Sequence, residues 1–549
     1  MTNEPTSVAP RVAARASWLP LIVVVLTQIQ VSFTVNALTV SMAGVTSDLN
    51  IAPTAIGTAI TTGTFAMAAF ILLGSKLGAK YGSRRVFQLA VAIHGVAMGL
   101  VALAANGSML LVGQALGGAV IALLAPALTV FIADNYSGTQ QAQAIGYLAA
   151  AIPAAGVLAL LIAGTLASTI GWRFSFGLLV LLAALNLFLS FRVRPVEPQS
   201  GLRIDWTGAL LSSVAIILLS FGFSGLTAWG VLLAKPGARF SILGLSPAPF
   251  LIVLGVLMAQ AFFSWTRRRQ AAHKPQLFSL EVIDTPEERA TTFCMATMLF
   301  VGTAANFLIP LYMQMVQGLT SLQTSFSIIP YTLSIFLAST LVAQLYDRVP
   351  PRQIARVGFI VVAAALTLIA FTIRNEWGQF FIVLGLITLG LAQGAIVALV
   401  FNTLLSASPK ELAGDVGAWR GLVHNMSGSV GIAVAGALAV ALLSTLIQSS
   451  LVDHPIITLD LQAQINLDNV NFLTNEQVED VLSRTTATPE QIAEAVRINA
   501  EMRLRALRAS LLFLASLALL AIVPAGRMPR YVPGDIPVGY PAEEREYGG

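Results

Sequence analysis

Charged residues are scarce in this chain. It has 549 residues but only 31 Lys+Arg and 26 Asp+Glu, or 10% charged, whereas soluble domains carry about 25%. Hydrophobic residues make up 56% of the chain, and the mean hydropathy is +0.80. So few charges cannot build the surface of a water-soluble enzyme, and a disordered chain would be poor in apolar residues. The composition therefore predicts an integral membrane protein.

The residues that bind metals and form disulfides are also few. A single cysteine, Cys294, excludes an intramolecular disulfide framework. The four histidines are scattered without the spacing of a metal site, and no Walker loop is present. We therefore expect no metal, no cofactor, no enzyme activity and no ATP-driven pump. The net charge of +5 does not indicate nucleic-acid binding, because Lys and Arg on cytoplasmic loops of a membrane protein explain it better.

Long apolar runs are what the chain has in abundance. A bilayer core is spanned by about 20 apolar residues in a helix. By that measure we predict fourteen membrane-spanning helices, at 18–44, 54–75, 86–105, 109–133, 144–168, 172–192, 206–227, 248–266, 289–315, 321–345, 353–373, 380–405, 416–446 and 503–526.

The positive charges predict an orientation for these spans. With the N-terminus in the cytoplasm, 22 of the 31 Lys+Arg fall on cytoplasmic segments, as the positive-inside rule expects. An even number of spans then places both termini in the cytoplasm. We therefore expect a multi-pass protein of the cytoplasmic (plasma) membrane.

Three polar stretches divide the chain. Two of them, 192–205 and 267–288, flank a pair of helices and separate this pair from six helices before it and six helices after it. The third, 447–502, contains two helix-capping signatures, Thr474 with Gln477 and Thr488 with Gln491. We expect a cytoplasmic N-terminus at 1–17, a six-helix bundle at 18–192, a two-helix insert at 206–266, a second six-helix bundle at 289–526 containing an extracytoplasmic helical hairpin at 447–502, and a disordered cytoplasmic tail at 527–549.

Several segments carry a family resemblance. The run SKLGAKYGSRRV, from Ser75 to Val86, resembles the G-x-L-x-D-R-x-G-R-R loop of the major facilitator superfamily. The segments GWRFSF from Gly171, DWTGAL from Asp205, LYMQMVQGL from Leu311 and GSVGIAV from Gly428 are similar to the fourteen-helix drug:proton antiporter branch. The resemblance implies two six-helix bundles that alternate access to a central site, and export coupled to protons.

The chain departs from the family pattern in its first half. The acid of the signature loop is replaced by Ala79, the helix 1 acid by Thr34 and the helix 4 arginine by Gln114. The glycine-proline pattern of helix 5 is replaced by ALLIAG at 159–164. The first half thus lacks three charged positions and a Gly-Pro pair of the family pattern.

The second half keeps a copy of the loop. Asp347, Arg348 and Arg352 match the pseudo-symmetric segment between helices 10 and 11. The resemblance implies a cytoplasmic latch of carboxylate–guanidinium bonds between helix ends, which form in one conformation and break in the other. We assign to it Asp347, Arg348, Arg352, Lys80, Arg84 and Arg85. Positive-inside anchoring is the alternative role for these cations.

No Asp or Glu lies in the middle of a predicted span, so any pathway must be lined by other polar groups. Gln28, Ser32 and Asn36 recur every four residues and form a stripe on the first helix. The candidate cavity residues are Gln28, Ser32, Asn36, Gln114, Asn306, Gln314, Gln393, His424 and Asn425. The alternative for each is an interhelical hydrogen bond. His424 is the candidate proton carrier, whereas we expect His94 to be structural.

These features predict a secondary transporter that exports an amphipathic small molecule by alternating access. Without a buried carboxylate, the substrate is expected to be neutral, zwitterionic or anionic rather than a lipophilic cation. A lipid or envelope-precursor transporter that uses the 447–502 hairpin is an alternative, with a lipid-like substrate. A transport-inactive membrane scaffold or sensor is another. We expect a monomer in the lipid bilayer.

Overall fold

The computed structural model describes residues 17–529, except 137, 196–197, 199–200, 236–237, 239, 346–347, 375–378, 408–411 and 454–473. The predicted tail at 527–549 and the N-terminus at 1–17 therefore lie almost wholly outside the described residues. Within the described ranges the regular structure is helical, apart from two isolated β-bridges near Leu245. The all-α fold class is confirmed.

The helices fall into three groups along the chain. The first group is α1 (Leu19–Val40), α2 (Met42–Leu49), α3 (Pro53–Tyr81), α4 (Ser83–Ala102), α5 (Gly107–Asn135), α6 (Gly138–Thr169) and α7 (Arg173–Ser190). The second is α8 (Trp206–Trp229) and α9 (Pro247–Ala271). The third is η1 (Leu280–Ile283), α10 (Pro286–Met315), α11 (Ser321–Leu345), α12 (Pro351–Thr372), α13 (Gln379–Ala407), α14 (Ala413–Asp453), α16 (Asn475–Ser483), α17 (Pro489–Leu520) and α18 (Ile522–Ala525).

The number of spans agrees with the prediction. Among the described residues, 13 helices are long and apolar enough to cross a membrane. The remaining predicted span, 144–168, falls in α6, whose apolar part is the shorter stretch Ala154–Thr169. The fold is therefore compatible with fourteen spans.

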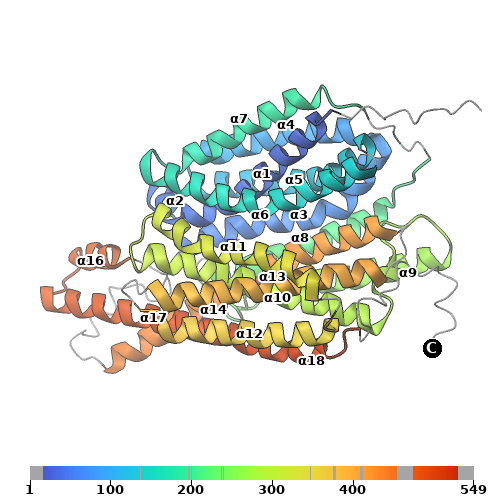
Figure 1. The fold of residues 1–549 in the computed structure, drawn as a ribbon. Coiled ribbons are helices and arrows are strands. Elements are labelled where there is room, and N and C mark those ends of the chain that lie inside the picture. Colours follow the sequence, from blue (N-terminus) through green and yellow to red (C-terminus); the bar gives the residue numbers. More distant parts are fainter. Residues whose placement is uncertain are drawn as a thin grey trace, which may run out of the picture.

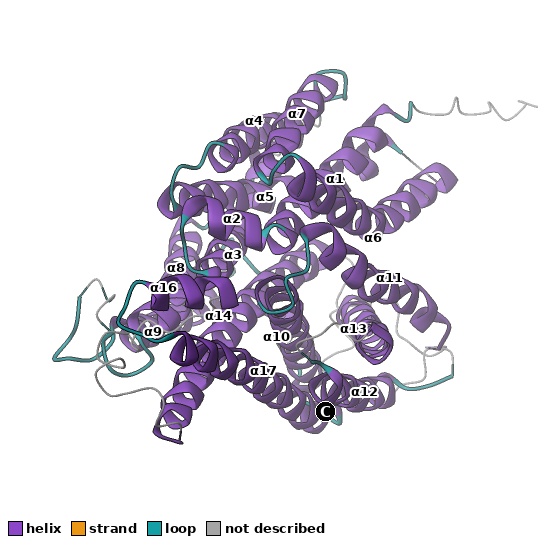
Figure 2. Ribbon diagram, turned by 90° about the vertical axis from the view of Figure 1, so that its left-hand side faces the viewer, coloured by secondary structure: helices purple, strands orange, loops and turns teal. Residues whose placement is uncertain are grey.

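The first and third groups form two bundles that lie side by side (Figures 1 and 2). In the first bundle α3 packs on α5, α5 on α4, α4 on α7 and α1 on α6; in the second, α11 packs on α13, α13 on α12, α12 on α17 and α10 on α14. The bundles meet where α3 packs against α14 and α6 against α11. We call this meeting surface the seam. The two-helix insert, α8 and α9, attaches to α3 and α14 through α8.

Glycine allows the closest helix crossings in both bundles. A Cβ on Gly118 of α5 would lie 1.8 Å from the carbonyl oxygen of Gly63 in α3. In the second bundle, a Cβ on Gly394 of α13 would lie 2.2 Å from the carbonyl oxygen of Ile335 in α11. Small residues are the usual means of bringing helix backbones into contact in membranes, because the helices gain no hydrophobic driving force there. The two bundles therefore use the same packing device at equivalent crossings.

One predicted helix is broken. The first span was expected to run continuously over 18–44, but it divides at Ser41 into α1 and α2. The short α2 ends at Asn50, whose left-handed conformation (φ 50°) suits asparagine better than most residues. The cause of the break lies in the other bundle and is described below.

The capping signatures are confirmed. Thr474 and Gln477 form a capping box at the start of α16, and Thr488 and Gln491 form another at the start of α17. Helix α17 then continues without interruption from Pro489 to Leu520, as expected from its sequence. The rest of the predicted hairpin, 454–473, lies outside the described residues.

Two arginines of α17 hold the ends of neighbouring helices. The Arg503 Nη1 donates to the carbonyl oxygen of Met315 at the end of α10, at 3.4 Å. The Arg508 Nη2 donates to the carbonyl oxygen of Ile373 at the end of α12, at 2.8 Å. The last carbonyls of a helix have no partner within it and carry partial negative charge. Both arginines therefore stabilise helix C-termini and attach α17 to its bundle.

Candidate functional site

The two ends of the molecule differ in their contacts across the seam. We call the end that holds α2 and α16 the α2 end, and the end that holds α18 the α18 end (Figure 1). Helices α1, α4, α6, α8, α10, α12 and α14 run from the α18 end to the α2 end, and their partners run back. The polar contacts of the seam are described from one end to the other.

Gln314 closes the seam at the α2 end. Its Nε2 donates to the carbonyl oxygen of Thr39, at 3.0 Å, and its Oε1 accepts from the backbone N–H of Ala43, at 3.1 Å. Thr39 and Ala43 are four residues apart, so in a continuous helix these two groups would bond to each other. The Gln314 amide thus inserts into the backbone hydrogen-bond ladder of the first span. Such an insertion is a known cause of helix breaks and explains the division at Ser41.

A second contact joins the bundles at the same end. The backbone N–H of Leu322, at the start of α11, donates to the Oγ of Ser168 near the end of α6, at 3.0 Å. Beside it, a Cβ on Gly164 would meet the Oγ of Ser325. The α6–α11 half of the seam is therefore also tightly packed at the α2 end.

Hydroxyl groups join the helices in the middle of the seam. The Oγ atoms of Thr64 in α3 and Ser429 in α14 lie 2.5 Å apart. On its other side, α3 bonds the insert, because Ser213 of α8 donates to the carbonyl oxygen of Ala69, at 2.8 Å. Helix α3 therefore connects the first bundle to both other groups.

An ion pair lies at the α18 end of the seam. The Lys76 Nζ is 3.3 Å from the Oδ1 of Asp415, with side-chain exposures of 28% and 17%. The other carboxylate oxygen, Oδ2, accepts from the backbone N–H of Ser279, at 3.0 Å. Asp415 therefore joins α3, α14 and the segment that follows the insert. Neither Lys76 nor Asp415 is among the predicted site residues, although Lys76 lies in the signature loop.

The predicted latch residues are placed differently. The Arg84 Nη2 donates to the carbonyl oxygen of Phe191, at 2.7 Å, and the Lys80 Nζ lies over the ring of Tyr81. Arg85 is exposed at the start of α4, and Arg348 and Arg352 lie beside the start of α12. Asp347 lies outside the described residues. Among the described residues, the ion pair across the seam is the one between Lys76 and Asp415.

The predicted stripe of the first helix is bonded within itself. Gln28 donates to the Oγ of Ser32, at 3.2 Å, and Asn36 donates to the carbonyl oxygen of Ser32, at 2.8 Å. All three side chains are half-buried. The stripe remains a candidate for contact with a substrate.

A fully buried polar network lies instead on another face of α1. Gln30 accepts from Asn186 of α7, at 2.9 Å, and its Nε2 lies 2.6 Å from the Nδ1 of His94 in α4. The His94 Nε2 is 3.2 Å from the Oγ1 of Thr34. Because the Gln30 amide donates to Nδ1, the imidazole is neutral with its proton on Nε2. This bonding supports a structural role for His94. Gln30 and Asn186 were not among the predicted site residues, because a single amide in an apolar run does not form a periodic pattern.

Three further candidates lie between helices, Gln114 and Gln393 buried and Asn306 half-buried. Gln114 is 4% exposed and lies beside Gly63, and its Nε2 has no hydrogen-bond partner among the residues that the structure describes. In the second bundle, Gln393 accepts from the Tyr331 hydroxyl, at 2.6 Å, in space left by Gly302. Asn306 lines a small cavity nearby, between α10, α11 and α13.

The polar residues of α14 lie on different faces. Asn425 donates to the carbonyl oxygen of Gly421, at 2.7 Å, on the face that packs against α3. His424 is exposed, one turn from Arg420. The guanidinium of Arg420 lies 4.3 Å above the ring of Phe401 in α13, a cation–π contact. Arg420 and His424 thus share the face of α14 that turns toward α13.

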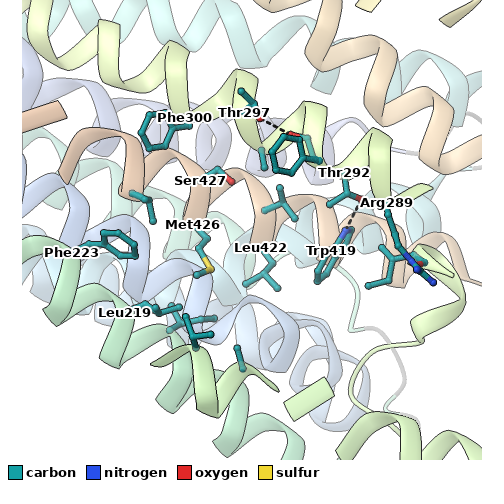
Figure 3. Close-up of a pocket in the computed structure, with 18 of the residues that line it drawn as sticks. Leu219, Phe223, Arg289, Thr292, Thr297, Phe300, Trp419, Leu422, Met426 and Ser427 are labelled. Carbon is teal, nitrogen blue, oxygen red and sulfur yellow. Dashed lines mark hydrogen bonds between the residues drawn. The ribbon is translucent and has the colours of Figure 1, made fainter. Parts of the chain in front are cut away.

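A large apolar cavity lies elsewhere. It has a volume of about 1300 Å³ and lies between the insert (α8 and α9) and helices α10, α14 and α17 (Figure 3). Its walls are almost entirely apolar, and Arg289 is the charged residue among those that line it. None of the nine predicted cavity residues lines it. The helices around this cavity are apolar on all faces, so the sequence pattern does not indicate which of their residues line it.

Comparisons with known proteins agree with this architecture. The model of the Major Facilitator Superfamily matches residues 24–432. The chain is 26% identical over 379 residues to the tetracenomycin C resistance and export protein of Streptomyces glaucescens, covering 68% of this chain and 66% of that protein. It is 27% identical over 445 residues to the puromycin resistance protein pur8 of Streptomyces alboniger, covering 78% and 81%.

Among solved structures, the chain resembles a bacterial homolog of the human lysosomal transporter Spinster in an inward-facing and occupied conformation. The TM-score is 0.60 with 15% sequence identity, over 93% of this chain and 98% of that one. At this identity the likeness concerns the fold alone.

Proposed function

The chain belongs to the major facilitator superfamily, and from that premise we propose that it is a secondary active exporter of amphipathic small molecules. The observation that carries the proposal is the seam: two helix bundles meet along α3–α14 and α6–α11 and are bonded across both ends. Two bundles that rock about a central site are the arrangement by which secondary transporters alternate access. The resistance and export proteins named above support export of a small molecule over the lipid-precursor and scaffold alternatives.

The orientation follows from the distribution of positive charge. The α18 end carries Lys76, Arg84, Arg267, Arg268 and Arg269, among others, which the positive-inside rule places in the cytoplasm. The α2 end, with its α16, then faces outward. Because Gln314 and Ser168 bond the bundles at that end, we interpret the structure as a state closed to the outside.

The substrate class is proposed from what the seam and the bundle interiors contain. The described candidates are neutral amides and hydroxyls, with Arg420 and His424 beside them. A lipophilic cation in a low-dielectric site is stabilised by a buried carboxylate. We therefore propose neutral, zwitterionic or anionic amphiphiles as substrates. His424 remains the proposed proton carrier, because an imidazole can take up and release a proton whereas the amide and hydroxyl candidates do not.

Transport by the purified protein in liposomes tests this proposal. The panel is tetracenomycin C, for which a relative is named, and ethidium as a lipophilic cation. We expect tetracenomycin C flux that stops when the pH gradient is collapsed, and ethidium flux no greater than in empty liposomes. Gradient-driven ethidium flux would refute the substrate class. Flux of no compound, with the protein folded, would favour the scaffold alternative.

A further prediction, with a smaller expected effect on transport, concerns the ion pair at the α18 end. Lys76→Glu places like charges together across the seam, and we expect transport to slow about fivefold, since partly exposed pairs are worth about 1 kcal/mol. Adding Asp415→Lys to Lys76→Glu restores an ion pair with the charges reversed and should recover part of the transport rate. Recovery should be partial, because the backbone N–H of Ser279 would still lack the carboxylate that accepts its hydrogen bond.

The matched control is Lys80→Glu, one turn further along α3, where the ammonium lies over Tyr81 rather than across the seam. Transport rates in the same liposomes decide the outcome. Equal slowing by Lys76→Glu and Lys80→Glu, without recovery in the reversed pair, would show that the seam pair has no role.

A further inference from the structure

The large apolar cavity begins in the half of the membrane nearer the α18 end. Many of its wall residues come from the first parts of α10 and α14, such as Arg289 and Trp419, and from the last part of α17, such as Phe513. Along the insert its walls continue past the middle of α8 and α9, to Phe223 and Ile252. The cavity therefore starts in one leaflet, the cytoplasmic one in the orientation proposed above, and reaches past the midplane.

We propose that this cavity is a binding site for an anionic phospholipid, whose acyl chains lie between the insert and the second bundle and whose phosphate is bound by Arg289. The site is distinct from the central pathway between the bundles. It rests on the membrane location that the family establishes and not on the identity of the exported substrate. Three features of the cavity carry the inference.

The first feature is the chemistry of the walls, which fits an acyl chain. Phe223, Phe293, Phe300 and Met426 face the cavity from three helices (Figure 3). Three of the four hydroxyl side chains in the walls form hydrogen bonds within the protein. Ser212 and Thr297 donate to carbonyl oxygens of their own helices, and Thr292 accepts from the indole of Trp419.

A volume of about 1300 Å³ exceeds the 300–1,000 Å³ or so of an ordinary small-molecule pocket. The space is therefore large and apolar rather than shaped for a polar ligand. Hydrocarbon chains are the component of a bilayer that matches it.

The second feature is the charge at one edge of the cavity. Arg289 lies in the first turn of α10, where the proposed orientation places the lipid headgroups. Its guanidinium is oriented by two carbonyl oxygens, those of Ile283 at 3.1 Å from Nε and Asp284 at 2.5 Å from Nη2. A guanidinium binds phosphate oxygens through paired, charge-assisted hydrogen bonds.

The nearest acids do not compete for this arginine within the cavity. The Glu288 side chain accepts from the backbone N–H of Thr285 in a capping box, and Asp284 and Glu287 are not among the lining residues. The start of α10 also contributes the positive end of its helix dipole. The edge of the cavity therefore favours an anionic headgroup over a zwitterionic one.

The third feature is the weak attachment of α9. Only 17% of its most apolar stretch is buried, against 72% for α10, and it packs along α8. Its residues Ile252, Val256 and Ala259 face α10, α14 and α17 across the cavity. A lipid in this space would provide the packing that connects α9 to the second bundle.

Lipid binding to the purified full chain, measured by native mass spectrometry, tests the proposal. Phosphatidylglycerol and phosphatidylcholine with identical acyl chains are added in parallel. We expect phosphatidylglycerol to bind about tenfold more tightly, and Arg289→Gln to abolish that preference, as loss of a hydrogen-bonded charge would predict. Ala296→Trp, which fills the cavity from α10, should weaken binding of both lipids.

Two matched controls accompany these variants. Arg268→Gln removes the same charge from an exposed position at the end of α9, and Val96→Trp adds the same bulk on the exposed face of α4. Neither should change binding. Equal binding of the two lipids by the unmodified protein, or an equal loss in Arg289→Gln and Arg268→Gln, would overturn the proposal.

Transport is measured separately, so the two proposals can fail independently. Should Ala296→Trp not fold, the comparison of Arg289→Gln with Arg268→Gln still decides the site. A protein that transports its substrate but shows no headgroup preference refutes the lipid site alone.

Discussion

Gly118→Ala is expected to cost this protein about 3 kcal/mol or more of stability, although it adds one methyl group. The new Cβ would lie 1.8 Å from the carbonyl oxygen of Gly63 and 2.9 Å from its Cα, so the clash is with backbone and no side chain can turn away. Overpacking that side chains can relieve already costs about 1–3 kcal/mol. Here α3 and α5 must separate, and α3 also carries the seam.

The control is Gly177→Ala in α7 of the same bundle, where a Cβ would meet nothing within 4 Å. This change should be neutral or slightly stabilising, since alanine favours helix by up to about 1 kcal/mol over glycine. Resistance to unfolding by heat and by denaturing detergent, measured for both variants, distinguishes them. Equal stability of the two variants would contradict the close crossing of α3 and α5.

Gln314→Leu is expected to release the seam at the α2 end. The substitution removes two hydrogen bonds between the bundles and lets the Thr39 carbonyl oxygen bond the Ala43 N–H directly, which would straighten the first span. Hydrogen bonds contribute about 0.5–1.5 kcal/mol each, so the equilibrium should shift by about 1–3 kcal/mol, or roughly 5- to 150-fold, toward a state open at this end.

Distances between spin labels measure this shift. Cys294 is first replaced by serine, and labels are placed at the exposed positions Thr169 and Thr320, on the two sides of the seam at the α2 end. Gln314→Leu should add or enlarge a population with longer distances.

Gln317→Leu provides the matched control for that experiment. It lies three residues away and donates to the carbonyl oxygen of Arg374 within its own bundle. It should leave the distances unchanged. An unchanged distribution in Gln314→Leu would show that this amide does not hold the seam closed.

The prediction of the fold succeeded where the signal was local. The spans follow from the length of apolar runs, and the capping boxes at Thr474 and Thr488 follow from side chains that reach backbone groups three residues away. The continuous α17 was predicted for the same reason. Each of these features is decided by residues within a few positions of one another.

The prediction of the site was limited because the helices are surrounded by lipid rather than by water. A helix in lipid is apolar on the face that meets lipid and on the face that meets protein, so the pattern does not show which side is buried. Gln28, Ser32 and Asn36 were selected by their spacing, yet the fully buried amide of that helix is Gln30, bonded to His94. Gln314 was selected as a cavity residue, and its bonds to the first span indicate a different role.

The sequence by itself determined that this protein spans the membrane many times, with which helix caps and in which family. Charge, hydropathy and local capping contain that information. The tertiary structure alone decided that Gln314 breaks the first helix, that Lys76 pairs with Asp415 and that an apolar cavity lies beside Arg289. Each of these depends on residues more than 100 positions apart or on five helices at once, and only packing brings such groups together.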